Sequence, residues 1–270
     1  MPYAMGPQKT RLYYEVAGTT GPYVVLIQGL GLSARFWFDL PRRLTATGYR
    51  VVTLDNRGVG QSDCPRGPYT MARMADDVAA VLDAADIRSA HIVGISLGGM
   101  IAQHVALRHP ERTAGLVLLA TTPGLPHGRL PSPRNLAALL SLGFARRDRP
   151  GRALSRLLLS AKHLPRAREI LVDWPAAMQD NPASLRAFTA QLAAVVGHST
   201  GFRLKKIRCP TVVVAGADDI LVPPHNGRIL ARLIPNAQLD VVPDCGHGIP
   251  LIDEEVVHRA LEKLGALAGS

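Results

Sequence analysis

The sequence predicts an α/β protein built on a mostly parallel sheet that helices cover on both faces. Short apolar runs of five or six residues alternate with helical patterns through the first half of the chain. Such runs are expected of strands that are buried on both faces. The alternation stops near residue 125 and resumes at Pro210. The 270-residue chain is therefore expected to hold one sheet that a helical insertion interrupts.

Six apolar runs are the expected strands, at residues 23–27, 50–54, 90–95, 115–119, 211–215 and 238–242. The first expected helix, residues 70–85, begins with Thr70, whose side chain is a good helix cap, and repeats apolar residues such as Met74 and Val78 along one stripe. Three further helical patterns cover residues 97–108, 226–234 and 253–267. Each helix follows a strand, as a parallel sheet requires.

The insertion, residues 125–204, contains helical stretches broken by prolines and no strand-like run. We expect residues 1–124 and 205–270 to form the two parts of one core domain. Between residues 125 and 205, 13 basic residues stand against 4 acidic ones, so this part carries +9 of the formal net charge of +10. Such a segment can attract nucleic acid, anionic lipid or an acidic substrate. Because it is rich in arginine and has no interleaved aromatic residues, we expect a solvated surface and no nucleic-acid binding.

The sequence also bears on the compartment. No apolar run approaches the roughly 20 residues of a membrane span, and residues 1–23 lack the apolar stretch of a secretory signal. The three cysteines, Cys64, Cys209 and Cys245, are an odd number at irregular spacing, which favours neither a disulfide framework nor a zinc cluster. We expect a soluble, cytoplasmic protein without a bound metal.

A candidate nucleophile follows the third expected strand. Gly94, Ser96 and Gly98 form a G-x-S-x-G sequence between that strand and a helix. In this context the glycines permit a tight turn that lifts the serine hydroxyl above the carboxyl edge of the sheet. A serine at a helix start is often only a cap, but the flanking strand and the glycine spacing favour a nucleophile.

A serine nucleophile needs a base, and nine histidines are available. His247 lies in a glycine-flanked loop just after the last strand, at the edge of the sheet where Ser96 is expected. Asp218 and Asp219 follow the preceding strand, and either of them can orient the imidazole. The chain order of nucleophile, acid and base is the order expected for this kind of sheet.

Backbone N–H groups are the expected donors to an oxyanion. Leu97 supplies one at the start of the helix after Ser96. The loop after the first expected strand, residues 28–31, places Leu30 between two glycines, so its N–H is the second candidate.

These residues together resemble the α/β-hydrolase superfamily over nearly the whole chain. The resemblance rests on the G-x-S-x-G turn at Ser96, called the elbow below, and on a DxRGxGxS turn that begins at Asp55. It also rests on a GxxDxxxP loop at residues 216–223 and on Gly246–His247. It implies the α/β-hydrolase fold, makes residues 125–204 a helical cap and places the acid at Asp219. One departure is Gln28, where the family usually has histidine. Small bacterial carboxylesterases, enol-lactonases and polyketide methylesterases are the most similar members.

The implied function is that of a cofactor-free serine hydrolase for a small-molecule carboxylic ester or lactone. An acyltransferase or C–C bond hydrolase with the same triad, and a ligand-binding receptor with slow turnover, are the alternatives. We expect a substrate pocket lined by Gln28, Trp174, Met178, Val222 and Ile249. Asp55 and Arg57 are expected to stabilise a turn, and Asp76 and Asp77 to lie on a solvated helix face. The oligomeric state is left open.

Overall fold

The structure, a computed structural model, describes residues 3–141, 152–179 and 184–268. Eight strands form one sheet in the order β1-β2-β4-β3-β5-β6-β7-β8. Neighbouring strands from β4 to β8 pair in parallel. The strands are β1 (Tyr3–Gly6), β2 (Thr10–Ala17), β3 (Tyr23–Ile27), β4 (Arg50–Leu54), β5 (Ala90–Ile95), β6 (Thr113–Leu119), β7 (Thr211–Gly216) and β8 (Ala237–Val242). The six strands predicted from apolar runs are confirmed, and β6 begins two residues earlier than expected.

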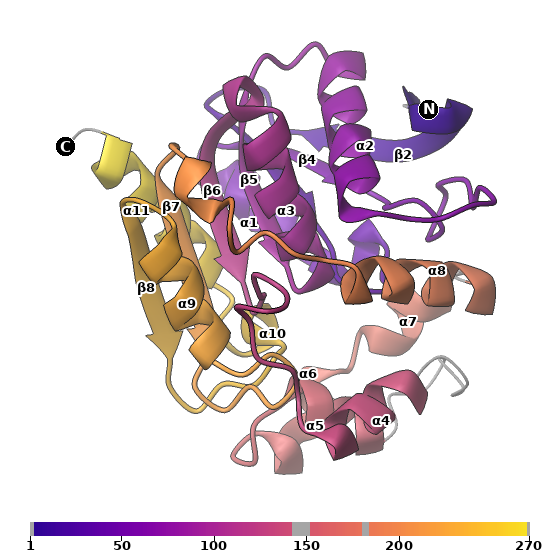
Figure 1. The fold of residues 1–270 in the computed structure, drawn as a ribbon, viewed down its shortest axis with the longest axis vertical. Coiled ribbons are helices and arrows are strands. Elements are labelled where there is room, and N and C mark those ends of the chain that lie inside the picture. Colours follow the sequence, from indigo (N-terminus) through magenta and orange to yellow (C-terminus); the bar gives the residue numbers. More distant parts are fainter. Residues whose placement is uncertain (1–2, 142–151, 180–183, 269–270) are drawn as a thin grey trace.

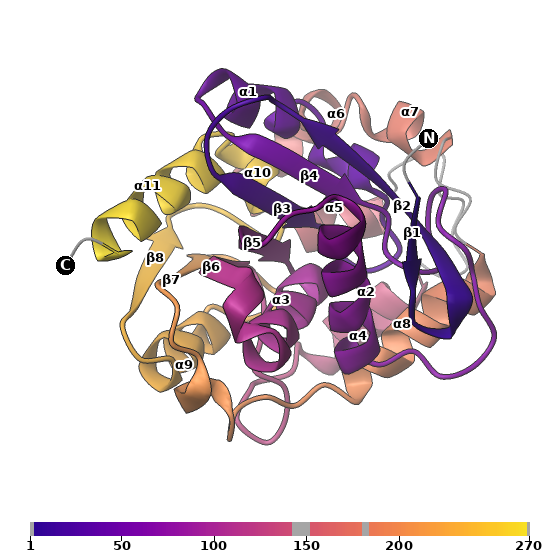
Figure 2. The same ribbon diagram turned by 90° about the horizontal axis from the view of Figure 1, so that it is seen from above.

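Helices cover both faces of the sheet, with α1 and α11 on one face and α2, α3 and α9 on the other (Figure 2). Successive residues of β3 serve the two faces in turn, because Val24 and Leu26 pack in one apolar core and Val25 and Ile27 in the other. Covering both faces explains why the strands read as continuous apolar runs. The covering helices are α1 (Leu40–Ala46), α2 (Met71–Ala84), α3 (Leu97–Arg108), α9 (His225–Leu233) and α11 (Val256–Ala268).

Two strands at one edge of the sheet, β1 and β2, were not predicted. They pair antiparallel with each other, and β2 also pairs antiparallel with β4. In β2 the buried residues Thr10, Leu12 and Tyr14 alternate with more exposed ones. This period of two is the signal of a half-buried strand, and a search for continuously apolar runs misses it.

One surface prediction was wrong. Thr70 caps α2 as expected, since its side chain accepts a hydrogen bond from the Arg73 N–H. Asp77 on that helix, however, is buried and forms a two-pronged ion pair with the fully buried Arg57, at 2.6 and 2.5 Å. Burial raises the pKa of Asp77 from its ordinary value, and Arg57 opposes that shift. Asp76 does lie at the surface, where it pairs with Arg108.

The predicted turn role of Asp55 is supported by its contacts. Its carboxylate accepts hydrogen bonds from the backbone N–H groups of Ala34 and Gln61, at 2.8 Å each. The Asp55 side chain therefore ties the turn after β4 to the segment that follows β3. Arg57 acts in the same region through its ion pair with Asp77.

The insertion forms a group of short helices beneath the carboxyl ends of the strands in Figure 1, on the side away from the amino terminus. Among its described residues there are helices but no named strand. An isolated bridge joins Gly124 to Ser199, which lie near the two ends of the insertion. The helices of the insertion, called the cap below, are α4 (Pro133–Ser141), α5 (Arg152–Leu158), α6 (Ala167–Ile170), α7 (Trp174–Gln179) and α8 (Leu185–Val196).

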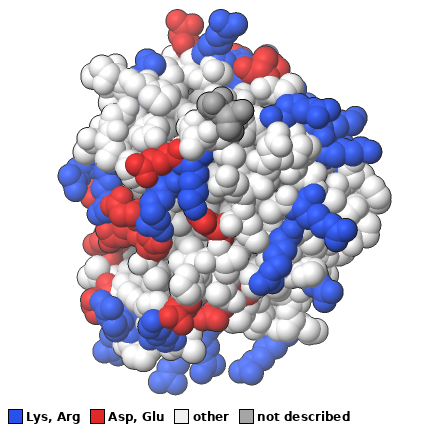
Figure 3. Space-filling model, turned by 90° about the vertical axis from the view of Figure 1, so that its left-hand side faces the viewer, with Lys and Arg blue, Asp and Glu red and all other residues white. Residues whose placement is uncertain are grey.

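The remaining short elements are α10 (Ile249–Ile252) and the 3-10 turns η1 (Pro7–Lys9), η2 (Ala34–Trp37), η3 (Pro110–Arg112), η4 (Leu164–Arg166) and η5 (Leu204–Lys206). None of the helices in the described part of the chain is long and apolar enough to cross a membrane. On the face shown in Figure 3 the basic side chains form several separate groups, and the group at the left is interleaved with acidic side chains. On this face the basic side chains therefore do not form one continuous patch.

Candidate active site

Ser96 occupies a strained turn between β5 and α3. Its backbone has φ 56° and ψ −117°, a positive φ that residues with a side chain seldom adopt. The flanking glycines leave room for this turn: a Cβ on Gly94 would lie 2.2 Å from the Gly98 oxygen, and one on Gly98 would lie 2.0 Å from the Ile27 oxygen. The Ser96 N–H donates to the Leu119 oxygen at 2.9 Å. The elbow is thus fixed by the sheet itself.

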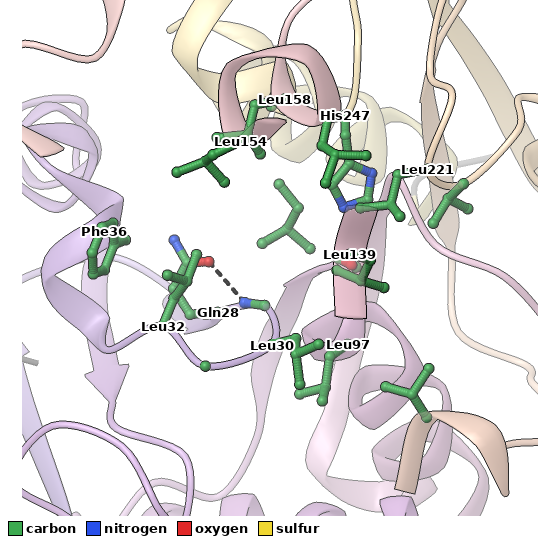
Figure 4. A pocket seen from close by; sticks show the side chains of 18 of the residues that line it. Gln28, Leu30, Leu32, Phe36, Leu97, Leu139, Leu154, Leu158, Leu221 and His247 are labelled. Atoms are coloured by element: carbon green, nitrogen blue, oxygen red, sulfur yellow. Dashed lines mark hydrogen bonds between the residues drawn. The ribbon is translucent and has the colours of Figure 1, made fainter. Parts of the chain in front are cut away.

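His247 and Asp219 meet at the carboxyl edge of the sheet. The His247 Nδ1 lies 2.8 Å from the Asp219 Oδ2, and both side chains are buried. Because the carboxylate accepts the proton on Nδ1, the Nε2 atom of a neutral imidazole keeps its lone pair. His247 and Ser96 both line one large cavity, and Figure 4 shows the His247 ring at its wall.

The structure separates the two candidate acids. The Asp219 Oδ1 accepts hydrogen bonds from the N–H groups of Leu221 and Val222 at 2.8 Å, which leaves its Oδ2 for His247. Asp218 is exposed, and its N–H donates to the Cys245 oxygen. The chain therefore brings Asp219, not Asp218, to the imidazole.

Two backbone N–H groups near Ser96 are the candidate oxyanion donors. Leu97 is the first residue of α3, where helix geometry leaves the N–H without a partner. Leu30 lies in the loop after β3, residues 28–31, which we call the oxyanion loop after the role expected of it from the sequence. Neither N–H donates to any of the residues that the structure describes. Both residues line the cavity, so the two predicted donors are brought to one place.

The oxyanion loop is held by the cap. The Gly31 N–H donates to the Oε1 of Gln191 at 2.8 Å, and the Gln191 Nε2 donates to the Arg57 oxygen at 2.9 Å. Gln191 belongs to α8 and is fully buried. Gly31 has φ +70°, and a Cβ on it would lie 3.2 Å from the Phe188 ring of the same helix. Sequence reasoning missed Gln191, because no short motif marks a contact between residues 160 positions apart.

The cap also contacts the loop of His247. The Gly248 N–H donates to the Leu158 oxygen at 2.8 Å, and the Ser160 hydroxyl donates to the Asp244 oxygen at 2.6 Å. A Cβ on Gly246 would lie 2.7 Å from the Leu158 oxygen, so the two backbones are in close contact. Leu158 is the last residue of α5 and Ser160 follows that helix. Neither of them was assigned a role from the sequence.

The cavity between core and cap has a volume of about 990 Å³ and is walled mainly by apolar side chains. Gln28, Trp174, Met178 and Val222 line it as predicted. Ile249 does not: it is fully buried and packs in the core between the sheet and α11, while its neighbours Gly248 and Pro250 reach the cavity. Within the described residues, no group of three or more histidine, cysteine or acidic side chains is arranged to hold a metal ion.

A pair of buried histidines lies where the cap joins the core. The His104 and His198 rings are 5.5 Å apart, and the His198 Nε2 lies 3.0 Å from the Thr122 oxygen. Burial lowers the pKa of His104 to about 3 and that of His198 to about 4. Both imidazoles are therefore neutral near neutral pH. Neither was among the predicted site residues, although His198 lines the cavity.

Comparison with known proteins agrees with this fold. The family model described as alpha/beta hydrolase fold matches residues 22–254. The protein of Caulobacter sp. strain K31 named for carbamate hydrolysis, RutD, is 34% identical over 93% of this chain and 94% of its own. The Mycobacterium tuberculosis protein named as the non-heme bromoperoxidase BpoC is 33% identical over 94% and 97% of the two chains.

A solved structure extends the comparison. It is described as Est816, an N-acyl homoserine lactone degrading enzyme, and it superposes with a TM-score of 0.80 at 30% identity, covering 97% of this chain and 99% of that one. The names of these relatives cover several reactions, so the fold alone does not choose among substrates. The chain belongs to the alpha/beta hydrolase fold family, as an esterase-like hydrolase.

Proposed function

We propose that the protein hydrolyses a carboxylic ester or lactone through an acyl-enzyme on Ser96. The observation that carries the proposal is the contact of His247 with Asp219 at the wall of the cavity that Ser96 also lines. A carboxylate on Nδ1 leaves Nε2 as the base, and the elbow presents a hydroxyl to the same space. The esterase-like family supports the assignment.

In the proposed reaction the Ser96 Oγ attacks the carbonyl carbon while the His247 Nε2 takes the hydroxyl proton. The carbonyl oxygen becomes an oxyanion that accepts hydrogen bonds from the Leu30 and Leu97 N–H groups. The intermediate collapses, the C–O bond to the alcohol breaks, and His247 returns its proton to the leaving oxygen. Water activated by His247 then releases the acid and restores Ser96. Asp219 holds the imidazole and stabilises its charged form.

The cavity suggests what kind of ester fits. Its volume of about 990 Å³ and its leucine-rich wall favour a substrate with a large apolar group. A carbamate and a lactone, which two of the relatives are named for, present the same kind of carbonyl to Ser96. We propose that residues 125–204 act as the cap that encloses this group.

The test combines covalent labelling with turnover. A fluorophosphonate is expected to modify Ser96 alone, as read by peptide mass spectrometry. The Ser96→Ala variant is expected to lower kcat by about 10⁵–10⁶-fold on an ester that the enzyme hydrolyses. Ser89→Ala is the matched control, because that serine lies in the loop before β5. Modification of another serine, or full activity in Ser96→Ala, would contradict the proposal.

A panel of esters, lactones and carbamates graded by size then identifies the substrate class. Repeated release of acid from one of them excludes a receptor that turns over once. Added alcohols that capture the acyl group in preference to water would instead show a transferase.

A further inference from the structure

Gln28 begins the oxyanion loop, and its side chain is held in one orientation. The side chain is buried, with the residue 5% exposed. Its Oε1 accepts a hydrogen bond from the Gly29 N–H at 2.7 Å, drawn as a dashed line in Figure 4. Its main-chain oxygen accepts one from the Asn56 Nδ2 at 3.1 Å. The backbone and the carboxamide are thus both fixed.

This orientation determines where the donor end of the carboxamide points. A carboxamide has one acceptor end and one donor end, and a backbone N–H can only be met by the acceptor. The Oε1 therefore faces Gly29, and the Nε2 faces away from it. Figure 4 shows this nitrogen directed into the cavity, on the side of Phe36 and Leu154. No residue in the described part of the chain accepts a hydrogen bond from it.

The surroundings of this donor are apolar. Leu32, Phe36 and Leu154 line the same side of the cavity. When an apolar substrate fills this space and displaces water, an N–H₂ group left without an acceptor is destabilising. A substrate that carries an oxygen at this point avoids that loss and is favoured over one that does not.

Gln28 immediately precedes a residue that lies beside Ser96. A Cβ on Gly29 would lie 3.6 Å from the Ser96 Cβ, so the residue that Gln28 contacts is beside the nucleophile. The side chain of Gln28 and Ser96 line the same cavity, so one substrate can contact both.

We propose that Gln28 determines specificity by donating a hydrogen bond from Nε2 to a second oxygen function of the substrate. The preferred substrate is then an apolar ester or lactone with a ketone, amide carbonyl, ether or hydroxyl oxygen near the scissile carbonyl. This inference rests on the proposed ester hydrolysis. It goes beyond it by naming the chemical feature that separates good substrates from poor ones.

The test compares esters that differ only in one oxygen. Ethyl octanoate is measured against its 3-oxo, 4-oxo and 5-oxo analogues, and butyl octanoate against 2-methoxyethyl octanoate for the alcohol side. Acid release is followed by titration at constant pH. The wild-type kcat/KM is expected to favour one oxygen position by about tenfold over the matched oxygen-free ester. In Gln28→Leu that ratio is expected to fall to about 1.

Two further variants make the comparison decisive. Gln28→Glu keeps the length of the side chain and the acceptor for the Gly29 N–H but lacks the amide donor. It is therefore also expected to lose the preference. It replaces Gln28→Leu if that variant does not fold. Gln238→Leu, on the edge strand β8, is the matched control and is expected to keep the preference. A wild-type ratio of about 1 at every position, or a preference retained in both Gln28 variants, overturns the inference while ester hydrolysis stands. Failure to hydrolyse any ester overturns both.

Discussion

The two sides of the candidate site are held in different ways. The core holds the turn of Ser96, the proposed nucleophile, and the side chain of Asp219, the proposed acid. Ser96 is fixed by backbone contacts with β6 and β3, and Asp219 by the N–H groups of its own loop. The oxyanion loop and the His247 loop, in contrast to the turn of Ser96, each have a backbone N–H that donates to the cap, and the loop of Asp219 accepts one hydrogen bond from the cap, from the Asn135 Nδ2 to the Ile220 oxygen. The cap is therefore part of the scaffold of the site as well as its cover.

The core and the cap therefore support the site through different kinds of contact. Core contacts join residues that are neighbours along a strand or across a strand pair, so they form with the sheet. The cap contacts join Gly31 to Gln191 and Gly248 to Leu158, and they exist only when the cap is docked. We infer that displacement of the cap disturbs the donors and the base before it disturbs the nucleophile.

The largest expected effect concerns Asp219, the proposed acid. Asp219→Asn is expected to lower kcat by about 10⁴-fold with the fold intact, because an amide in that place favours the wrong imidazole tautomer. Asp218→Asn is the matched control and is expected to keep most activity, because that side chain is exposed and lies away from His247. Steady-state kinetics of both variants under one set of conditions decide the matter. If Asp218→Asn is inactive and Asp219→Asn is active, then Asp218 and not Asp219 orients the imidazole.

A smaller effect is expected at the cap-held loop. Gln191→Leu removes the acceptor of the Gly31 N–H and the donor to the Arg57 oxygen. We expect kcat to fall by about 10-fold to 100-fold with a smaller change in KM, because a misplaced oxyanion donor weakens binding of the transition state more than that of the substrate. Thr189→Ala, on the exposed side of α8, serves as control. If only KM rises in Gln191→Leu, the residue shapes the pocket without positioning the donors.

The smallest expected effect concerns the histidines at the junction of cap and core. The pKa of His104 is lowered to about 3 in the folded protein, against about 6.5 when unfolded. The unfolded chain therefore binds more protons than the folded one between these values, and stability is lost as the pH falls through this range. His198, Arg203 and Arg108 also lower this pKa, and Asp76 raises it.

His104→Leu removes this source of acid sensitivity. Between pH 6.5 and 5, a histidine that binds a proton only in the unfolded chain lowers the free energy of unfolding by about 1.5 kcal/mol. The variant is therefore expected to lose less of its free energy of unfolding over this range than the wild type, as measured by urea denaturation. Equal losses in both proteins would show that His104 is protonated in the folded state as easily as in the unfolded one.

The sequence predicted the parts of the fold that local pattern determines. Strands buried on both faces appear as unbroken apolar runs, and the G-x-S-x-G sequence marks the elbow at Ser96. The resemblance selected Asp219 from two adjacent acids, and the structure places that residue against His247. The spacing alone left both open.

The wrong and missing predictions share a physical cause. Asp77 looked solvent-exposed, because nothing near it in the chain reveals the buried Arg57 that pairs with it. Ile249 was placed in the pocket, but its side chain turns into the core, although its neighbours Gly248 and Pro250 line the cavity. Gln191 was not identified, because its partners are distant in the chain. Each depends on tertiary packing that sequence spacing does not contain.

The backbone of Ser96 has a consequence for how this sequence can change. A positive φ at a residue with a side chain destabilises the folded state by about 1–3 kcal/mol, and glycine would relieve most of that strain. Selection for thermal resistance alone therefore favours glycine at this position, and selection for turnover keeps serine. If Ser96 is the nucleophile that we propose, the most stable sequence of this chain and the active sequence differ at this residue.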